Sequence, residues 1–462
     1  MPAIITKDFR IQNANQFSES FGESADTYYL AIGRPQAFAD NQAFNDGTDT
    51  SPPTPVDSVG SVDYYVYDDL LSAKKISSSN VSAVIPRRNW TTGTTYDYYR
   101  HDYGEINSAG TVIAANSGAT TLHDATFYVM NSTFDVYKVI DNNGDSASTV
   151  EPTGNKSTSV FSTGDSYKWK YMYSLSASEQ ANFLSTDFMH VSTESTDYST
   201  TAGAIENAKV TAGGSGGTNG TYTNVDIRGD GSSGKATVVV SSNAVTSVTI
   251  TTAGSGYTFA SVLASDIGGV SGADIDFIIS PPGGHASDAV AELGGFFVMM
   301  NVDFATSESG EFNTSNDFRR IALLRNPTDS TTGSTATAST LDATKSMTFS
   351  GTPGSFQADE KITQASTGAV GFVVDFNSTT KVLRYIQPQF TNQGVDSNGN
   401  LTAFSSTNTV TGATSGATGT PSSHDITPEL TADSGDILYI ENRKPISRAS
   451  DQTENVKLIV EF

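Results

Sequence analysis

The chain has 462 residues, no cysteine and a formal net charge of −24 at pH 7. That charge repels phosphate groups, so binding to nucleic acid or to an anionic membrane would need a local basic patch, and we expect neither partner. The lack of cysteine excludes disulfides, zinc–thiolate sites and thiol nucleophiles, and it favours assembly in a reducing compartment.

The N-terminal residues contain no apolar segment of the kind that a signal peptide has. The longest apolar run lies around residues 296–300. It is far shorter than the roughly 20 residues that a membrane-spanning helix needs. The sequence therefore predicts neither a signal peptide nor a membrane span.

Alternation of apolar and polar residues dominates the chain and is typical of half-buried strands. The clearest case is 167–175, where aromatic residues occupy every second position. Helical patterns are few: one covers 176–184 with Ser178 as its cap, and one covers 62–74, where apolar residues recur at spacings of three and four. We therefore predict a mainly β fold with a few short helices (α+β). The other predicted strands are 126–130, 135–140, 236–240, 245–250 and 457–462.

Residues 203–284 differ in composition from their surroundings, because they are rich in Gly, Ser and Thr and contain almost no Lys, Arg or Glu. They also repeat: a Thr-Ala-Gly motif begins at Thr211 and again at Thr252, an offset of 252 − 211 = 41 residues. Two copies are too few for a solenoid, which needs at least three. We interpret 203–284 as a compact inserted β domain built from a duplicated hairpin unit.

A second Ser/Thr-rich region covers 329–425. Three apolar segments within it, 356–364, 366–374 and 381–386, have the pattern of strands. We therefore predict a second inserted β module, flanked by mobile loops.

Two motifs resemble known functional loops, but each lacks a residue that its function requires. Residues 229–235 resemble a phosphate-binding loop, but Ala236 follows the lysine where Ser or Thr is required, and a strand pattern follows instead of a helix. Residues 141–145 resemble the start of a calcium loop, yet the twelfth position is Pro152 instead of glutamate. The five histidines are far apart and have no metal-ligand spacing. We predict no catalytic residue, metal site or cofactor, although paired-carboxylate glycosidase chemistry is not excluded by the residues alone.

Two basic islands stand out in this acidic chain. The first has two arginines beside a tryptophan, and the second lies near the C-terminus and is followed by an acidic segment. Arginine and tryptophan are typical of energetically important positions at protein interfaces. The alternative is that the arginines pair with carboxylates of their own fold, and the residues alone favour the two interpretations equally. The candidate interface residues are Arg87, Arg88, Trp90, Asn442, Arg443, Asp451 and Gln452.

The two islands carry a resemblance to the baseplate wedge family of T4-like contractile-tail bacteriophages, and to its dimer-forming wedge subunits in particular. Further motifs occur in the same order along the chain, and the resemblance covers about 1–195, 285–328 and 426–462. Each motif is weak by itself, whereas their collinear order is fairly specific. The motifs lie at 29–34, 52–53, 57–59, 83–90, 136–141, 164–165, 167–171, 318–319, 326–327, 439–446 and 451–454.

The resemblance implies a discontinuous, β-sandwich-like core made of 1–202, 285–328 and 426–462, into which 203–284 and 329–425 are inserted, as in cyanophage-like wedge proteins. It also implies a structural subunit of the tail baseplate, assembled in the host cytoplasm, that forms a homodimer and contacts other wedge subunits without catalysis. One alternative remains: a receptor-binding adhesin of the virion that uses the inserts to bind host-surface glycans.

Overall fold

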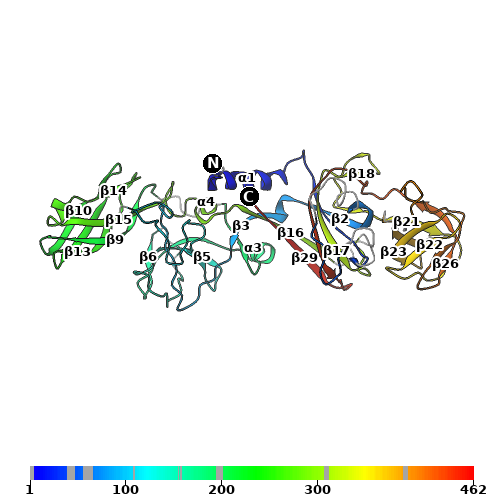
Figure 1. The fold of residues 1–462 in the computed structure, drawn as a ribbon, viewed down its shortest axis with the longest axis horizontal. Coiled ribbons are helices and arrows are strands. Elements are labelled where there is room, and N and C mark those ends of the chain that lie inside the picture. The colour runs from blue at the N-terminus through cyan, green and yellow to red at the C-terminus, as the bar shows by residue number, and fades with distance from the viewer. Residues whose placement is uncertain are drawn as a thin grey trace. The chain divides into compact units, whose positions relative to one another are not determined.

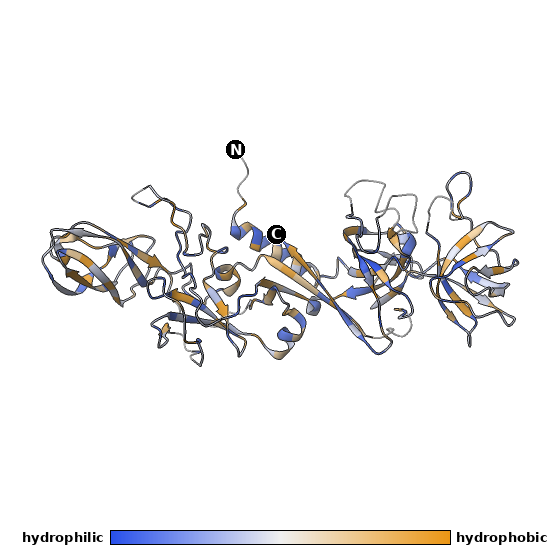
Figure 2. Cartoon of the chain, turned by 60° about the horizontal axis from the view of Figure 1, so that its bottom comes forward, coloured by the Kyte–Doolittle hydropathy of each residue, from blue (hydrophilic) through white to orange (hydrophobic). Residues whose placement is uncertain are grey.

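The computed structural model describes residues 5–38, 47–55, 66–107, 110–154, 156, 159–193, 201–305, 312–388 and 394–462. Strands make up most of its regular structure and helices are short and few, so the predicted mainly β fold is confirmed (Figure 1). Hydrophobic residues follow the strands, where hydrophilic residues alternate with them (Figure 2). The chain divides into two compact units, unit 1 with residues 1–16, 82–299 and 459–462, and unit 2 with residues 17–81 and 300–458.

Unit 1 contains an antiparallel sheet with the strand order β4-β5-β7-β6. Its core is unusually aromatic: Trp169 and Tyr167 are fully buried and their rings stack with centroids 5.4 Å apart. The alternation that predicted strands at 126–130, 135–140 and 167–175 thus reflects real sheet pairing. The strands are β4 (Tyr128–Met130), β5 (Asp135–Asp141), β6 (Phe161–Ser162) and β7 (Lys168–Ser174).

The predicted helix at 176–184 is present as α3 (Ala177–Phe183). Its cap, however, is Ser176 and not Ser178. The Ser176 hydroxyl accepts a hydrogen bond from the backbone N–H of Glu179, and the Glu179 carboxylate accepts one from the N–H of Ser176. This reciprocal capping box satisfies two amides that the helix leaves without partners, which places the start of the helix two residues earlier than expected.

The segment after the insert, also in unit 1, begins with the short helix α4 (Ala289–Leu293), which Asp288 caps by accepting from the N–H of Ala291. The α1 helix (Lys7–Ser20) was not predicted, because only Ile11 and Ala14 in it are buried and the sequence shows no apolar stripe. No helix among the described residues is long and apolar enough to cross a membrane.

Residues 205–279 form three small antiparallel sheets, β10-β12-β13, β11-β14 and β9-β15, around a hydrophobic cluster drawn from this segment alone. The two copies of the repeat share a backbone feature: Gly214 and Gly216 have φ of 69° and 77°, and Gly254 and Gly256 have φ of 64° and 74°. Only glycine adopts such angles without strain, which explains the repeated Gly-Ser-Gly. The elements are β9 (Ile205–Ser215), β10 (Gly220–Asp226), β11 (Arg228–Gly229), β12 (Lys235–Ser241), β13 (Ala244–Thr252), β14 (Ala260–Ser261) and β15 (Ser271–Ile279).

Unit 2 contains a five-stranded antiparallel sheet with the order β20-β2-β1-β17-β28. Of the helix predicted at 62–74, Val66 is helical and Tyr67–Asp69 form one 3-10 turn, but the prediction is wrong from Leu70, where β2 starts. Pairing of β2 with β1 on one side and β20 on the other outweighs the local helical spacing. The strands are β1 (Tyr28–Gly33), β2 (Leu70–Ile76), β17 (Phe318–Arg325), β20 (Thr340–Asp342) and β28 (Asp436–Ile446).

A seven-stranded sheet in unit 2 has the order β26-β25-β22-β23-β24-β21-β27. It contains the three strands predicted within 329–425, and its cluster includes the fully buried Ile362 and Tyr385. Its strands are β21 (Lys345–Phe349), β22 (Lys361–Gln364), β23 (Ala369–Asn377), β24 (Val382–Ile386), β25 (Val410–Gly412), β26 (Thr418–Gly419) and β27 (Pro421–Asp425).

A further sheet has the order β29-β16-β3-β8, formed by β3 (Val81–Pro86), β8 (Phe188–His190), β16 (Phe297–Ala305) and β29 (Thr453–Glu461).

Candidate functional site

The centre of the candidate site in unit 2 is the buried carboxylate of Asp69. Its two oxygens accept hydrogen bonds from Nη1 of Arg320 at 2.8 and 2.9 Å, and Nη1 of Arg34 lies 3.7 Å away. The backbone takes part as well, since the N–H of Arg34 donates to the carbonyl of Asp69 at 2.9 Å. A Cβ on Gly33 would lie 2.7 Å from that same carbonyl oxygen, so the approach of β1 to Asp69 requires glycine at this position.

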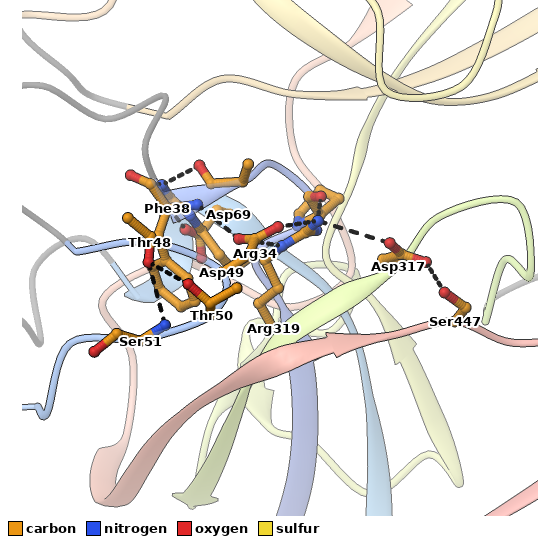
Figure 3. Close-up of polar contacts among 12 residues, drawn as sticks. Arg34, Phe38, Thr48, Asp49, Thr50, Ser51, Asp69, Asp317, Arg319 and Ser447 are labelled. Carbon is orange, nitrogen blue, oxygen red and sulfur yellow. Dashed lines mark hydrogen bonds and ion pairs between the residues drawn. The ribbon is translucent and has the colours of Figure 1, made fainter.

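A second ion pair in unit 2 anchors the segment that follows β1 (Figure 3). Nε and Nη2 of Arg319 donate to the two carboxylate oxygens of Asp49, both at 2.9 Å, and Nη1 donates to the carbonyl of Pro35. Asp49 in turn accepts from the N–H of Phe38 at 3.1 Å. The hydrogen bond from Arg319 is the main reason that the pKa of Asp49 is lowered. The Asp49 carboxylate is therefore held charged by its partners.

The predicted interface residue Asn442 belongs to this network of unit 2. Its Oδ1 accepts from Nε of Arg320 at 3.0 Å, and its Nδ2 donates to the carbonyl of Pro53 at 3.0 Å. Arg443 is half-exposed and pairs with Glu441 on its own strand at 3.3 Å. Two motifs that carry the resemblance, those at 29–34 and 439–446, thus reach the Asp69 network through Arg34 and Asn442, whereas Arg319 of the motif at 318–319 binds Asp49.

The other two candidates near the C-terminus, Asp451 and Gln452, lie in an exposed turn. The N–H of Gln452 donates to the carbonyl of Ala449 at 3.1 Å, and its Oε1 accepts from the N–H of Ala449 at 3.4 Å. These contacts close the turn before β29. The motif at 57–59 lies outside the described residues.

The first basic island lies in unit 1, and its arginines bind backbone carbonyls. Nη1 of Arg87 donates to Ser185 at 2.8 Å, and Nη2 of Arg88 donates to His123 at 3.1 Å while Nη1 donates to Ala125. The guanidinium of Arg88 also lies over the Tyr128 ring, 4.5 Å from its centroid. Both arginines are used within their own unit, although their partners are carbonyls and not the expected carboxylates.

Trp90 joins a hydrogen-bond network centred on Asp165. Its indole N–H donates to Ser148 Oγ at 3.1 Å, and Ser148 Oγ donates to Asp165 Oδ2 at 3.0 Å. The indole N–H of Trp169 donates to Thr163 Oγ1 at 3.1 Å, and that hydroxyl donates to Asp165 Oδ1. Burial raises the pKa of Asp165, but these hydrogen bonds and those from backbone amides outweigh burial and lower it. Both tryptophans of the chain are therefore linked through one carboxylate.

Sequence reasoning named neither Asp69 nor Asp165 as a centre. Asp69 belongs to an acidic pair that looks like many others in a chain with 50 acidic residues. Asp165 does lie within a family motif, and its position two residues before the aromatic alternation was the available signal. The seven predicted interface residues divide between the units, with Arg87, Arg88 and Trp90 in unit 1 and Asn442, Arg443, Asp451 and Gln452 in unit 2. Their role in an interface stays a prediction.

The arrangement supplies rigidity more than reactivity. Within the described ranges, no three His, Asp or Glu side chains converge on a point that could hold a metal ion. Lys235 in the loop-like motif pairs with Asp226, and strand β12 begins there, which is the geometry of a hairpin. The acids of the calcium-like motif also have cationic partners: Asp141 lies 3.3 Å from Lys168 and Asp145 lies 3.4 Å from Lys209.

Sequence comparisons agree with the resemblance seen in the motifs. Residues 3–147 match the family described as Bacteriophage T4, Gp8. The chain is also 27% identical over 218 residues to the baseplate wedge protein gp8 of Enterobacteria phage T4, an alignment that covers 41% of this chain and 60% of that protein. Both comparisons support the resemblance that the motifs indicate. The chain spans only about 60% of the length of this relative.

Proposed function

We propose that this relative of the T4 baseplate wedge protein is a structural subunit of a contractile-tail baseplate wedge, that it forms a homodimer and that it bridges neighbouring wedge proteins. One observation carries the proposal: the residues that link the chain to the family, among them Arg34, Arg319 and Asn442, are bound into a single buried framework. Such residues hold the fold in one conformation, and an assembly subunit needs a fixed conformation to fit its neighbours. The proposal includes no catalytic step.

Strand β28 supports a dimer contact. It is an edge strand with 11 residues, and β17 is its one neighbour in the described sheet. An edge strand offers unpaired N–H and C=O groups to another chain. Leu438 and Tyr439 on β28 are 42% and 40% exposed, so pairing there would also bury apolar surface. Arg443 lies on the same strand, which agrees with its predicted interface role.

Light scattering on the full chain at micromolar concentration tests the dimer. We expect twice the mass of one chain for the wild type and a monomer for the double variant Leu438→Lys, Tyr439→Lys. Phe259, which is 61% exposed in the first inserted segment, supplies the matched control, since Phe259→Lys should stay dimeric. A monomeric wild type would contradict the dimer. A dimeric double variant would show that β28 does not form the dimer contact.

Immunogold labelling of purified tails tests the location. Label confined to the baseplate supports the wedge assignment, whereas label along the fibres overturns it. No observation on the described residues favours the adhesin alternative over the wedge subunit.

A further inference from the structure

A lysine and a glutamate meet in the interior of unit 1. Lys138 in the middle of β5 and Glu292 on α4 form an ion pair, and their side chains are 0% and 2% exposed. The two residues belong to the segments before and after the insert 203–284. Charged residues this deeply buried are rare and costly unless they are paired, so the pair has a definite role.

Backbone amides from the turn before α4 hold the glutamate carboxyl. Its Oε2 accepts a hydrogen bond from the N–H of Ala286 at 3.1 Å, and its Oε1 accepts one from the N–H of Asp288 at 3.2 Å. Fixed donors of this kind stabilise negative charge that develops on a carboxyl oxygen when a nucleophile attacks the carbon. The turn therefore resembles a small oxyanion hole around the Glu292 carboxyl.

Deep burial, and not its immediate neighbours, disfavours the charge of the lysine amine. Its Nζ lies 4.8 Å from the centroid of the Tyr99 ring, within the aromatic core. Burial lowers the pKa of Lys138, and it outweighs the opposing attraction of Glu292 and Glu206. The neutral amine is the nucleophilic form, so this site favours the reactive state.

His285 contacts the same tyrosine. Its ring meets the Tyr99 ring edge to face with centroids 4.9 Å apart. Its Nδ1 is buried and has no hydrogen-bond partner among the described residues. Burial holds the pKa of His285 well below its ordinary value, and the charge of Lys138 contributes. The imidazole is therefore held neutral and places no second positive charge beside Lys138.

We propose that Lys138 and Glu292 condense to an intramolecular amide that joins the two core segments on either side of the insert. The amine lone pair attacks Cδ, and the N–H of Asp288 holds the oxyanion that develops on Oε1. Oε2, which already accepts from Lys138 Nζ, takes the two protons that the nitrogen gives up and leaves as water. One C–N bond forms, one C–O bond breaks and one water molecule leaves, so the step needs no oxidant and no cofactor.

Such a bond gives a cysteine-free chain a covalent staple that reducing conditions do not cleave. It closes a loop of 154 positions, from β5 through the whole insert to α4. A cross-link over a long loop removes much of the conformational freedom of the unfolded chain. It would keep the two core segments joined when mechanical force acts on the inserted segment.

Intact mass spectrometry of the denatured full chain tests the bond. We expect the wild type to be lighter than its sequence by the mass of one water molecule, and a proteolytic digest to contain a branched peptide that joins Lys138 to Glu292. Lys138→Arg keeps the charge but lacks the amine, so it should have the full mass. The neighbouring buried lysine supplies the matched control, since Lys170→Arg should keep the deficit.

The full sequence mass for the wild type would overturn the proposal, as would a deficit that persists in Lys138→Arg. If the variants fail to fold, the peptide map of the wild type decides alone, because it needs no substitution. The result is independent of the wedge assignment, which concerns where the chain is located and not how it is linked internally.

Discussion

Arg320 donates from Nη1 to both carboxylate oxygens of Asp69, at 2.8 and 2.9 Å, although the two residues lie 251 positions apart. The bond joins the start of β2 to β17 inside unit 2, across a stretch of chain that includes the whole first insert. Asp69 is 1% exposed and also faces Arg34 at 3.7 Å. One carboxylate thus contacts two buried guanidinium groups at once.

Replacement of Asp69 by alanine should be among the most destabilising single changes in unit 2. It removes the carboxylate that binds the buried Arg320 and faces Arg34, and breaking a buried ion pair in this way costs about 3–5 kcal/mol. Urea denaturation followed by circular dichroism measures this cost. The matched control is Asp436→Ala, because Asp436 pairs with Arg325 at 2.7 Å on the exposed surface, where such a pair contributes roughly 0–1 kcal/mol. Equal losses for the two variants would contradict the assignment.

Asp165→Ala should loosen both tryptophans together. The substitution leaves the Ser148 and Thr163 hydroxyls and the N–H groups of Thr149 and Val150 without their acceptor. The expected loss is about 2–3 kcal/mol of unfolding free energy, because buried donors without partners are costly. Tryptophan emission should shift to longer wavelength as Trp90 and Trp169 meet water.

The control for this change is Asp230→Ala. Asp230 accepts from the N–H and hydroxyl of Thr258 at 2.8 and 2.6 Å, far from either tryptophan in sequence and inside the first inserted segment. Its removal should leave the emission maximum unchanged. If the emission of Asp165→Ala also stays at its wild-type position, the network does not hold the two indoles.

Local alternation predicted strands such as β5, β7 and β12, because sheet residues that face the core are apolar at every second position, but it missed β1, β17 and β28 of the five-stranded sheet. The helical spacing at 62–74 misled because Leu70 and Ala73, three residues apart, are both buried in a strand, and pairing with β1 decided the outcome. The collinear motifs identified Arg34, Arg319 and Asn442 as important. They could not show that Arg34 faces Asp69, that Arg319 binds Asp49 or that Asn442 binds Arg320, because these contacts join chain segments far apart in the sequence, which no local pattern encodes.

Stability should fall as the pH drops from about 6.5 to about 4, with His123 as one cause. Burial, helped by the positive charges of Lys7, Arg10 and Arg88, lowers the pKa of His123 to about 4. The unfolded chain takes up the proton near pH 6.5, so stability present above that value is lost as the pH falls toward the folded pKa. The loss should be on the order of 2–3 kcal/mol by pH 4.

Two variants isolate the contribution of His123. His123→Phe keeps the edge-to-face contact with Phe296, whose centroid lies 5.8 Å away, and His123→Gln keeps a neutral polar group. Both should show a shallower decline of unfolding free energy between pH 6.5 and 4 than the wild type. The main-chain carbonyl that Arg88 uses is unchanged in either variant. A wild-type slope in both would show that His123 is not the group that titrates.

Residues 205–279 should be removable without unfolding the rest of unit 1. The N–H of Ser280 donates to the carbonyl of Ala204 at 2.8 Å, and Ser280 Oγ accepts from the N–H of Ala204 at 2.9 Å, so the cut ends are adjacent and a short Gly-Ser linker closes them. The deleted segment also carries its own hydrophobic cluster, which means that its loss exposes little of the remaining core.

The deletion still has a cost, because the segment is bound to the core at its base. Arg100 pairs with Asp276 at 2.9 Å, and Asn207 Nδ2 donates to the carbonyl of Ile140 at 2.9 Å. Loss of both should lower the unfolding free energy of the remainder by about 1–3 kcal/mol, since hydrogen bonds to charged groups contribute more than neutral ones. Arg100→Ala in the full chain is the matched variant, and it should account for much of that loss. A cooperative urea transition for the deleted chain and for the isolated segment 201–284 would establish two independent folding units, whereas a remainder without a cooperative transition would show that the insert is part of the core.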